Sequence, residues 1–296
     1  MDRLDVIIFL STIGVFVVLA VIFTALLYAT GGDLIYAVPF SFLMLFIQWY
    51  IGPFMVKLFT GAKEVSKEEA PELHNMVEEL AKKAGIPKPK VCMVHNNSPN
   101  AFAFGRTQKS SYVAVHTGLL NILSKEEVEA VLAHEIGHIK HRDVFVITMA
   151  SVLPVLLYWG VIFALSGRDR ERQNPFAVWM GALFAQFVGQ LAVLWLSRQR
   201  EFFADAFSKK IIGDPLPLGR ALVKISYSLN RYRNENPTMR AFYIGEGEDI
   251  SDDVIRSVSG GRKDIMEAIK RDSGMSIVEW FSTHPRTVNR LRALFS

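Results

Sequence analysis

Four long stretches of this sequence carry no charged side chain, and polar, mixed sequence separates them. The stretches cover residues 6–32, 34–56, 144–167 and 173–197. Each is long enough to cross the hydrocarbon core of a bilayer, which takes about 20 predominantly apolar residues in a helix. We therefore predict four transmembrane helices, the first two of which form a hairpin through the turn at residues 31–33.

Residues 57–143, between the second and third apolar stretches, show the patterns of a water-soluble segment. Apolar positions at helical spacing cover residues 66–83, and the sequence Gly85-Ile86-Pro87 ends that pattern. Three short runs rich in strand-forming residues follow, at 90–95, 101–104 and 111–116. We expect one helix followed by a small β-sheet.

The sequence after the fourth apolar stretch is polar and mixed. Its apolar spacing predicts helices over residues 218–232, 262–270 and 288–294, with a long loop at 233–261. The sequence thus predicts a mainly helical α+β protein in four parts. These are a membrane hairpin (1–56), the first part of a soluble domain (57–143), a second membrane pair (144–197) and the second part of that domain (198–296).

A helix with two histidines on one face is predicted just before the third apolar stretch. Ser124 and Glu127 have the spacing of a capping box, and apolar positions at helical spacing follow them. The sequence His134-Glu135-Ile-Gly-His138 places two imidazoles four residues apart, on the same helix face. Two imidazoles that can bind one metal, with Glu135 beside them as general base, are typical of a zinc hydrolase.

Two histidines leave a zinc site incomplete, because zinc enzymes use three protein ligands and keep one position open. A third histidine six residues after His138 is excluded, since Val144 stands there. Glu201 and Asp205 are four residues apart on one predicted helix face. We expect Glu201 to bind the metal and Asp205 to accept the free ring N–H of a metal-binding histidine. His141 lies roughly 60° off the face of His138, so we expect a surface or supporting position for it.

Composition excludes several other functions. The 296 residues carry a formal net charge of +4 without a basic tract, which argues against a nucleic-acid partner. Cys92 is the only cysteine, so neither an internal disulfide nor a cysteine-rich metal site can form. Its apolar surroundings predict a buried, inert thiol.

Basic residues near the apolar stretches predict the orientation in the membrane. Arg3 precedes the first stretch, three lysines follow the second at positions 57, 63 and 67, and the turn between the stretches has none. The positive-inside rule then places both ends of the hairpin, and the catalytic segment, in the cytoplasm. The loop at 168–172 carries three arginines, the wrong charge for an external loop. Either the two acidic residues of this loop offset its arginines, or the third and fourth apolar stretches do not fully cross the membrane. We favour full crossing because each of these stretches is long enough.

Four motifs, in their order along the chain, resemble those of the HtpX-type membrane zinc metalloproteases, which are relatives of the CAAX prenyl proteases. They are Asn100-Ala101-Phe102-Ala103, His134-Glu-Ile-Gly-His138, Glu201-Phe-Phe-Ala-Asp205 and Ser282-Thr-His284-Pro285. The resemblance covers nearly the whole chain, and the HtpX branch fits better because the prenyl proteases are longer.

The resemblance implies a domain type, a metal, a location and an activity. It implies a gluzincin-like domain with one Zn²⁺ per subunit, in the cell (inner) membrane of a prokaryotic-type cell. The expected activity is endoproteolysis of misfolded or damaged membrane proteins at the cytoplasmic face. The oligomeric state is not predicted.

Three features have two interpretations each. His284 is a candidate second donor to the oxyanion of the cleaved carbonyl, which the resemblance supports, or it fixes the chain before Pro285. Residues 100–104 form either an ordinary strand or an edge strand to which a substrate backbone pairs. Gln186 and Gln190 either bond a neighbouring helix or line the active-site chamber.

Three other functions compete with this prediction. A metal transporter or sensor would carry its ligands within the spans, whereas these lie just outside them and Glu135 would have no role. A non-proteolytic chaperone would not need a complete set of metal ligands. A CAAX-type processing protease is the nearest enzymatic alternative. Few residues separate His138 and Glu201 from the apolar stretches, so we expect the metal within roughly 10 Å of the ends of those spans.

Overall fold

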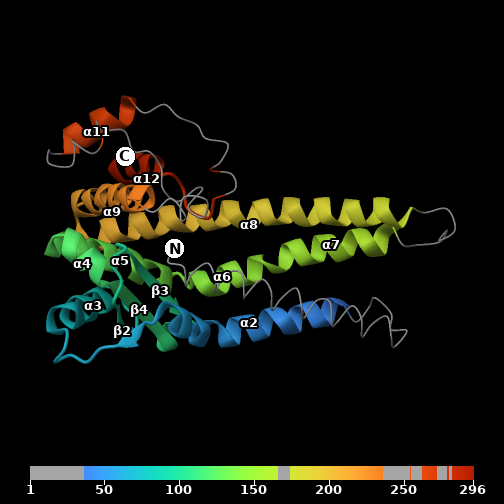
Figure 1. Ribbon diagram of the computed structural model, residues 1–296, viewed down its shortest axis with the longest axis horizontal. Helices are drawn as coiled ribbons and strands as arrows, with labels where there is room; N and C mark the ends of the chain where they lie inside the picture. The colour runs from blue at the N-terminus through green and yellow to red at the C-terminus, as the bar shows by residue number, and fades with distance from the viewer. Residues whose placement is uncertain (1–36, 166–173, 236–253, 255–261, 272–278, 280–281) are drawn as a thin grey trace.

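The computed structural model describes residues 37–165, 174–235, 254, 262–271, 279 and 282–296. A bundle of long helices projects from a part of the chain that holds the sheet and the shorter helices (Figure 1). The first predicted span, 6–32, and most of the predicted loop at 233–261 lie outside the described residues.

Within these residues, three helical segments are long and apolar enough to cross a membrane. They are α2 (Ala37–Thr60), the consecutive helices α6 (Asp143–Ala150) and α7 (Val152–Leu165), and α8 (Pro175–Ile212). Large apolar side chains such as Phe46, Phe54 and Phe184 are exposed on them, as expected for surfaces that face lipid. The second, third and fourth predicted stretches are therefore helical. Gln186 and Gln190 are both exposed on α8 rather than buried against a neighbouring helix.

The third apolar stretch is two helices because of a proline. Pro154 has no N–H to donate to the carbonyl of residue 150, and the helix breaks at Ser151, before it. Beyond the break, α7 packs along α8. They approach each other closely at Gly189, where a Cβ atom would lie 2.8 Å from the Cα atom of Pro154. This close crossing holds the two spans together.

Four strands form a mixed sheet in the order β1-β2-β4-β3. The strands are β1 (Lys63–Glu64), β2 (Lys90–Val94), β3 (Ala101–Gly105) and β4 (Ser111–His116). β2 and β4 run parallel, the other pairs are antiparallel, and β3 is an edge strand. The three predicted strands are confirmed, whereas the two exposed residues of β1 carry no apolar alternation that could have predicted it.

Helix α3 (Pro71–Ala84) begins five residues later than the predicted start at Ser66. Ser66 and Glu69 instead form a reciprocal pair in the preceding turn, each backbone N–H donating to the other's side chain. Pro71 disfavours the helical conformation at Ala70, so the helix cannot extend upstream through that residue.

The two faces of the sheet pack against different helices. One face and α3 pack against α5 (Lys125–Lys140), and the same core continues to α9 (Leu216–Glu235), α11 (Arg262–Arg271) and α12 (Thr287–Phe295). The other face packs against the end of α2 through Phe104, Ala114 and Val56. Cys92 is buried on this face, and burial raises the pKa of its thiol to about 11. The apolar helix α2 is therefore fixed directly to the sheet.

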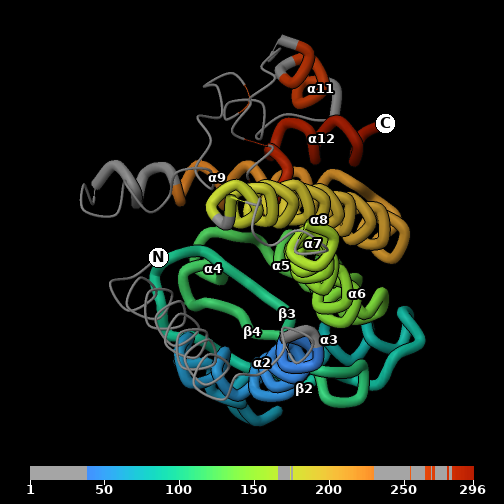
Figure 2. Tube along the Cα trace, turned by 90° about the vertical axis from the view of Figure 1, so that its right-hand side faces the viewer, coloured from blue at the N-terminus to red at the C-terminus, as the bar shows by residue number. Residues whose placement is uncertain are grey.

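Helix α8 is the central element of the molecule. Figures 1 and 2 show α9 and α12 on one side of α8, and α5 and α7 on the other. Helix α8 is continuous from its apolar part through residues 201 and 205, across the predicted boundary at residue 198. The residues expected to complete the metal site thus belong to the same helix as the fourth span.

Candidate active site

Helices α5 and α8 bring His134, His138 and Glu201 together. The Nε2 atoms of the two histidines lie 3.1 Å apart, and the carboxylate oxygens of Glu201 lie 3.4 Å and 3.6 Å from them. Ligand atoms in a tetrahedral zinc site with bonds of about 2.0–2.1 Å are separated by about 3.3–3.5 Å. The three residues predicted from the sequence therefore form a cluster that could hold a metal ion of this kind.

The ends of α5 are fixed by local interactions. Ser124 and Glu127 form the predicted capping box, with both hydrogen bonds present, and Lys224 of α9 donates to Glu127 at 2.7 Å. At the other end, Arg142 adopts a left-handed backbone conformation with φ of 57°. This turn ends α5 and starts α6 at Asp143, so that Asp143 faces back toward the cluster.

Two buried carboxylates orient the histidine rings. The Nδ1 atom of His134 lies 2.9 Å from Asp205, and the Nδ1 atom of His138 lies 2.6 Å from Asp143. Each carboxylate holds the Nδ1 side of a ring, which leaves Nε2 to face the cluster. Asp143 in turn accepts a hydrogen bond of 2.7 Å from Nε of Arg200.

Arg290 of α12 is a largely enclosed cation behind the cluster, with 12% of its side chain exposed. Its Nε and Nη2 atoms donate to Asp205 at 2.9 Å and 2.7 Å, and Nη1 lies 3.3 Å from Glu201. Burial opposes the charge, but the two carboxylates outweigh it and raise the pKa of Arg290 above its ordinary value. The sequence patterns did not identify Arg290 as part of the site. Its position within the predicted helix 288–294 is the only sequence signal for it.

Replacing Arg290 with methionine is expected to lower the free energy of unfolding by about 3–5 kcal/mol, because it leaves buried carboxylates without their cation. The free energy of unfolding of Arg290→Lys should lie between those of Arg290→Met and the wild type, because lysine restores the charge without the bidentate hydrogen bonding of arginine. Thermal unfolding in detergent with a chelator present separates this effect from metal binding. Arg292→Met, which changes an exposed arginine on the same helix, is the control. Equal unfolding temperatures for the two methionine variants would contradict the role given to Arg290.

Glu135 lies between the cluster and the sheet. It is buried, with 8% of its surface exposed, and this burial raises the pKa of its carboxyl group. The nearby backbone of Ala103 opposes that shift. Since Ala103 belongs to β3, the edge strand runs directly beside Glu135.

The other two candidate histidines have different surroundings. His284 is exposed, and its Nδ1 atom lies 3.3 Å from Glu201, next to the buried Pro285. His141 lies outside the cluster, at the end of α5, with its ring edge against Phe207 at a centroid distance of 5.4 Å. Burial lowers the pKa of His141.

A buried His-Glu-x-x-His cluster at the end of a bundle of apolar helices defines a membrane metallopeptidase. Residues 67–296 match Peptidase family M48, and the chain belongs to this family.

Its relatives agree with that assignment. A Protease HtpX homolog from Methanothermobacter thermautotrophicus is 45% identical over 210 residues, which cover 70% of this chain and 79% of that protein. A Protease HtpX homolog from Moorella thermoacetica is 39% identical over 285 residues, 92% of this chain and 87% of that protein. The crystal structure of S. mikatae Ste24p has a similar fold, with a TM-score of 0.62 at 21% identity, over 99% of this chain and 66% of that chain. The family predicted from the motifs is confirmed.

Gly137, between the two histidines, permits the close crossing of α5 and α8. A Cβ atom at this position would lie 3.1 Å from Phe207 and 3.3 Å from the Cα atom of Ala204. Gly137→Val is expected to force the helices apart, at a cost of typically 1–3 kcal/mol for overpacking, and to weaken metal binding by displacing Glu201. Melting temperature and metal affinity measure the two effects. Gly160→Val is the control, because a Cβ atom there has nothing within 4 Å, and equal effects would contradict the assignment.

Proposed function

We propose that this chain is a zinc endopeptidase that cleaves misfolded or damaged membrane proteins at the cytoplasmic surface of the cell membrane. The observation that carries the proposal is the convergence of His134, His138 and Glu201 at the end of the apolar helices. These three residues would hold one Zn²⁺ per chain. When bound, zinc supplies a Lewis acid that polarises a scissile carbonyl and makes water more acidic.

Glu135 would act as the general base and then the general acid. Its carboxylate would take a proton from the attacking water and later deliver it to the leaving amine. Asp205 and Asp143 would keep the histidine rings in the orientation that presents Nε2 to the metal. Arg290 would hold Asp205 and Glu201 in place as carboxylates. None of these supporting residues needs to touch the substrate.

The edge strand β3 would align the substrate. A peptide that adds to the free edge forms backbone hydrogen bonds without a requirement for one sequence, which suits a protease of damaged proteins. Asn100, Ala101, Phe102 and Ala103 would provide this edge, and the influence of the Ala103 backbone on the pKa of Glu135 supports its closeness to the general base. His284, exposed and 3.3 Å from Glu201, would donate to the developing oxyanion.

The proposed site would lie at the membrane surface, because three of its residues belong to the spanning helices. Helix α8 carries both Glu201 and Asp205, and Asp143 is the first residue of α6. On this proposal, residues 57–143 and 198–296 form one catalytic domain, interrupted by the membrane pair 144–197 and preceded by the hairpin 1–56. Substrates would be segments that emerge from the bilayer on the cytoplasmic side.

Removing the metal tests the proposed activity. The detergent-solubilised protein is expected to cleave casein, to lose this activity in a chelator of zinc, and to regain it when one equivalent of zinc is added. In sealed, inverted membrane vesicles, a soluble casein substrate should be cleaved from outside, because the cytoplasmic face is exposed there. Cleavage that persists in chelator would contradict the zinc mechanism. Cleavage only in vesicles of the opposite orientation would contradict the cytoplasmic site.

A further inference from the structure

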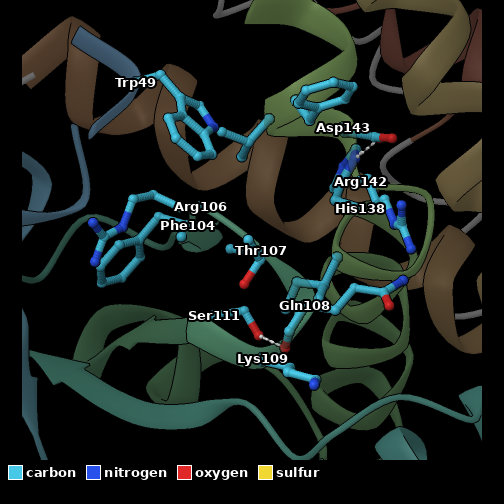
Figure 3. Close-up of a pocket in the computed structure, with 15 residues that line it drawn as sticks. Trp49, Phe104, Arg106, Thr107, Gln108, Lys109, Ser111, His138, Arg142 and Asp143 are labelled. Carbon is cyan, nitrogen blue, oxygen red and sulfur yellow. Dashed lines mark hydrogen bonds and ion pairs between the residues drawn. The ribbon is translucent and has the colours of Figure 1, made fainter. Parts of the chain in front are cut away.

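The metal cluster is approached from two sides by segments that are far apart in the sequence. On one side, β3 lies beside Glu135, and His138 borders a cavity of about 470 Å³ (Figure 3). On the other side, the segment 282–286 leads into α12, which lies across α8 from α5 (Figures 1 and 2). His284 belongs to this second segment, so the backbone of the segment sets where the ring of His284 lies.

Packing covers less than half of the His284 side chain. This side chain is 55% exposed, and its Nδ1 atom lies 3.3 Å from Glu201. A group that donates to a developing oxyanion has to keep its place within about 0.5 Å, and packing or hydrogen bonds from supporting residues hold it there. Because solvent faces most of this ring, the support has to come from the backbone that carries it.

Arg198 of α8 supplies hydrogen bonds to that backbone. Its Nη1 atom donates to the carbonyl oxygens of Glu279 at 2.9 Å and of Ser282 at 3.0 Å. The hydroxyl of Ser282 in turn accepts a hydrogen bond of 3.2 Å from the backbone N–H of His284. Arg198 precedes Glu201 by three residues on α8. The same helix therefore carries a candidate metal ligand and the side chain that holds the His284 segment.

The segment is also fixed after His284. The carboxylate of Glu279 accepts hydrogen bonds from the backbone N–H of Arg286 at 3.1 Å and from the side-chain amide of Asn289 at 3.0 Å. Arg198 binds the carbonyl oxygen of this same Glu279. The hydrogen bonds of Arg198 and Glu279 thus hold the segment on both sides of His284.

An arginine at the end of a span often has a different role. Arg198 directly follows the apolar stretch 173–197, and arginine side chains at such positions commonly extend toward lipid headgroups. Here the side chain is half-buried, and its guanidinium donates to two backbone carbonyls. Orientation in the membrane needs only the positive charge, whereas two hydrogen bonds from one nitrogen need a fixed geometry.

We propose that Arg198 is a positioning residue that holds the ring of His284 where the oxyanion of the cleaved bond forms, a role that rests on the peptidase function proposed above. Loss of its guanidinium would release the His284 segment without changing any atom that would bind the metal. Zinc content should therefore stay the same while the rate of the chemical step falls.

The test measures kcat and KM for casein cleavage by the zinc-loaded full chain in detergent. Arg198→Met is expected to lower kcat by about 10–100-fold and to change KM less than about threefold, because a displaced donor mainly affects the transition state. Arg198→Lys should recover part of the lost kcat, since an ammonium group can still donate to the carbonyls. Lys210→Met, which removes an exposed charge from the same helix, is the control and should keep both constants.

A double-mutant cycle determines whether Arg198 acts through His284. Arg198→Met added to His284→Ala should change kcat less than about twofold, because the group that Arg198 positions is already gone. A misfolded variant would lose activity in either background. Losses that multiply in the double variant would overturn the proposal, as would wild-type kcat or loss of zinc in Arg198→Met.

Two further outcomes separate this proposal from those it rests on. Wild-type kcat in His284→Ala alone would contradict the oxyanion role of His284, and the role of Arg198 would fall with it. If the zinc-loaded wild type cleaves no casein, the peptidase function itself fails.

Discussion

Replacing Glu135 with glutamine is expected to lower the rate of peptide cleavage by about two to four orders of magnitude while one zinc ion stays bound. Glutamine has nearly the same size and fits the same buried position. It cannot take a proton from water at neutral pH. The atoms that would bind the metal, on His134, His138 and Glu201, are unchanged by the substitution.

The measurement combines zinc content by mass spectrometry with the rate of casein cleavage, in the same preparation. Glu129→Gln, on the same helix α5, is the matched control and should keep both zinc and activity. Proteolysis at the wild-type rate by a zinc-loaded Glu135→Gln variant would remove the mechanism proposed here.

Replacing Glu201 with alanine should weaken zinc binding more than 100-fold, whereas His141→Ala should leave it nearly unchanged. Loss of a residue that only supports a ligand costs about 10–100-fold, and Asp205→Asn is expected within that range. Glu201 faces both Nε2 atoms of the cluster, while the ring of His141 packs against Phe207 outside it.

Zinc affinity can be measured by competition with a chromogenic chelator. Circular dichroism in the chelator then confirms that each variant retains its helices. An empty site in His141→Ala together with a full site in Glu201→Ala would show that the ligand set is wrong.

Local patterns predicted the elements of this fold well because they depend on neighbouring residues. The capping box at Ser124 and Glu127 set the start of α5, and helical spacing placed His134 and His138 on one face. The same spacing paired Glu201 with Asp205 on α8. Where a proline acts on its neighbours, at residues 71 and 154, the boundaries differ from those of the apolar pattern.

Contacts between distant segments could not be predicted in the same way. Asp143 begins an apolar stretch, so its charge looked like that of an ordinary membrane-surface residue, yet it binds both His138 and Arg200. Arg290 lies 85 positions from Asp205, and no periodicity relates the two. The role of Gly137 likewise depends on α8, the helix that crosses α5 at this residue. The roles of these residues can be recognised only in the folded structure, where α5, α8 and α12 lie together.

The most direct test of the central claim is X-ray absorption at the zinc edge of the purified, zinc-loaded protein. The account predicts one zinc ion with two imidazole nitrogens at about 2.0–2.1 Å and oxygen ligands at about 2.0–2.2 Å. Glu201→Ala should change the oxygen shell, and His141→Ala should leave the spectrum as it is. A third imidazole in the wild-type spectrum, or no stoichiometric zinc in an actively proteolytic preparation, would contradict a site made of His134, His138 and Glu201.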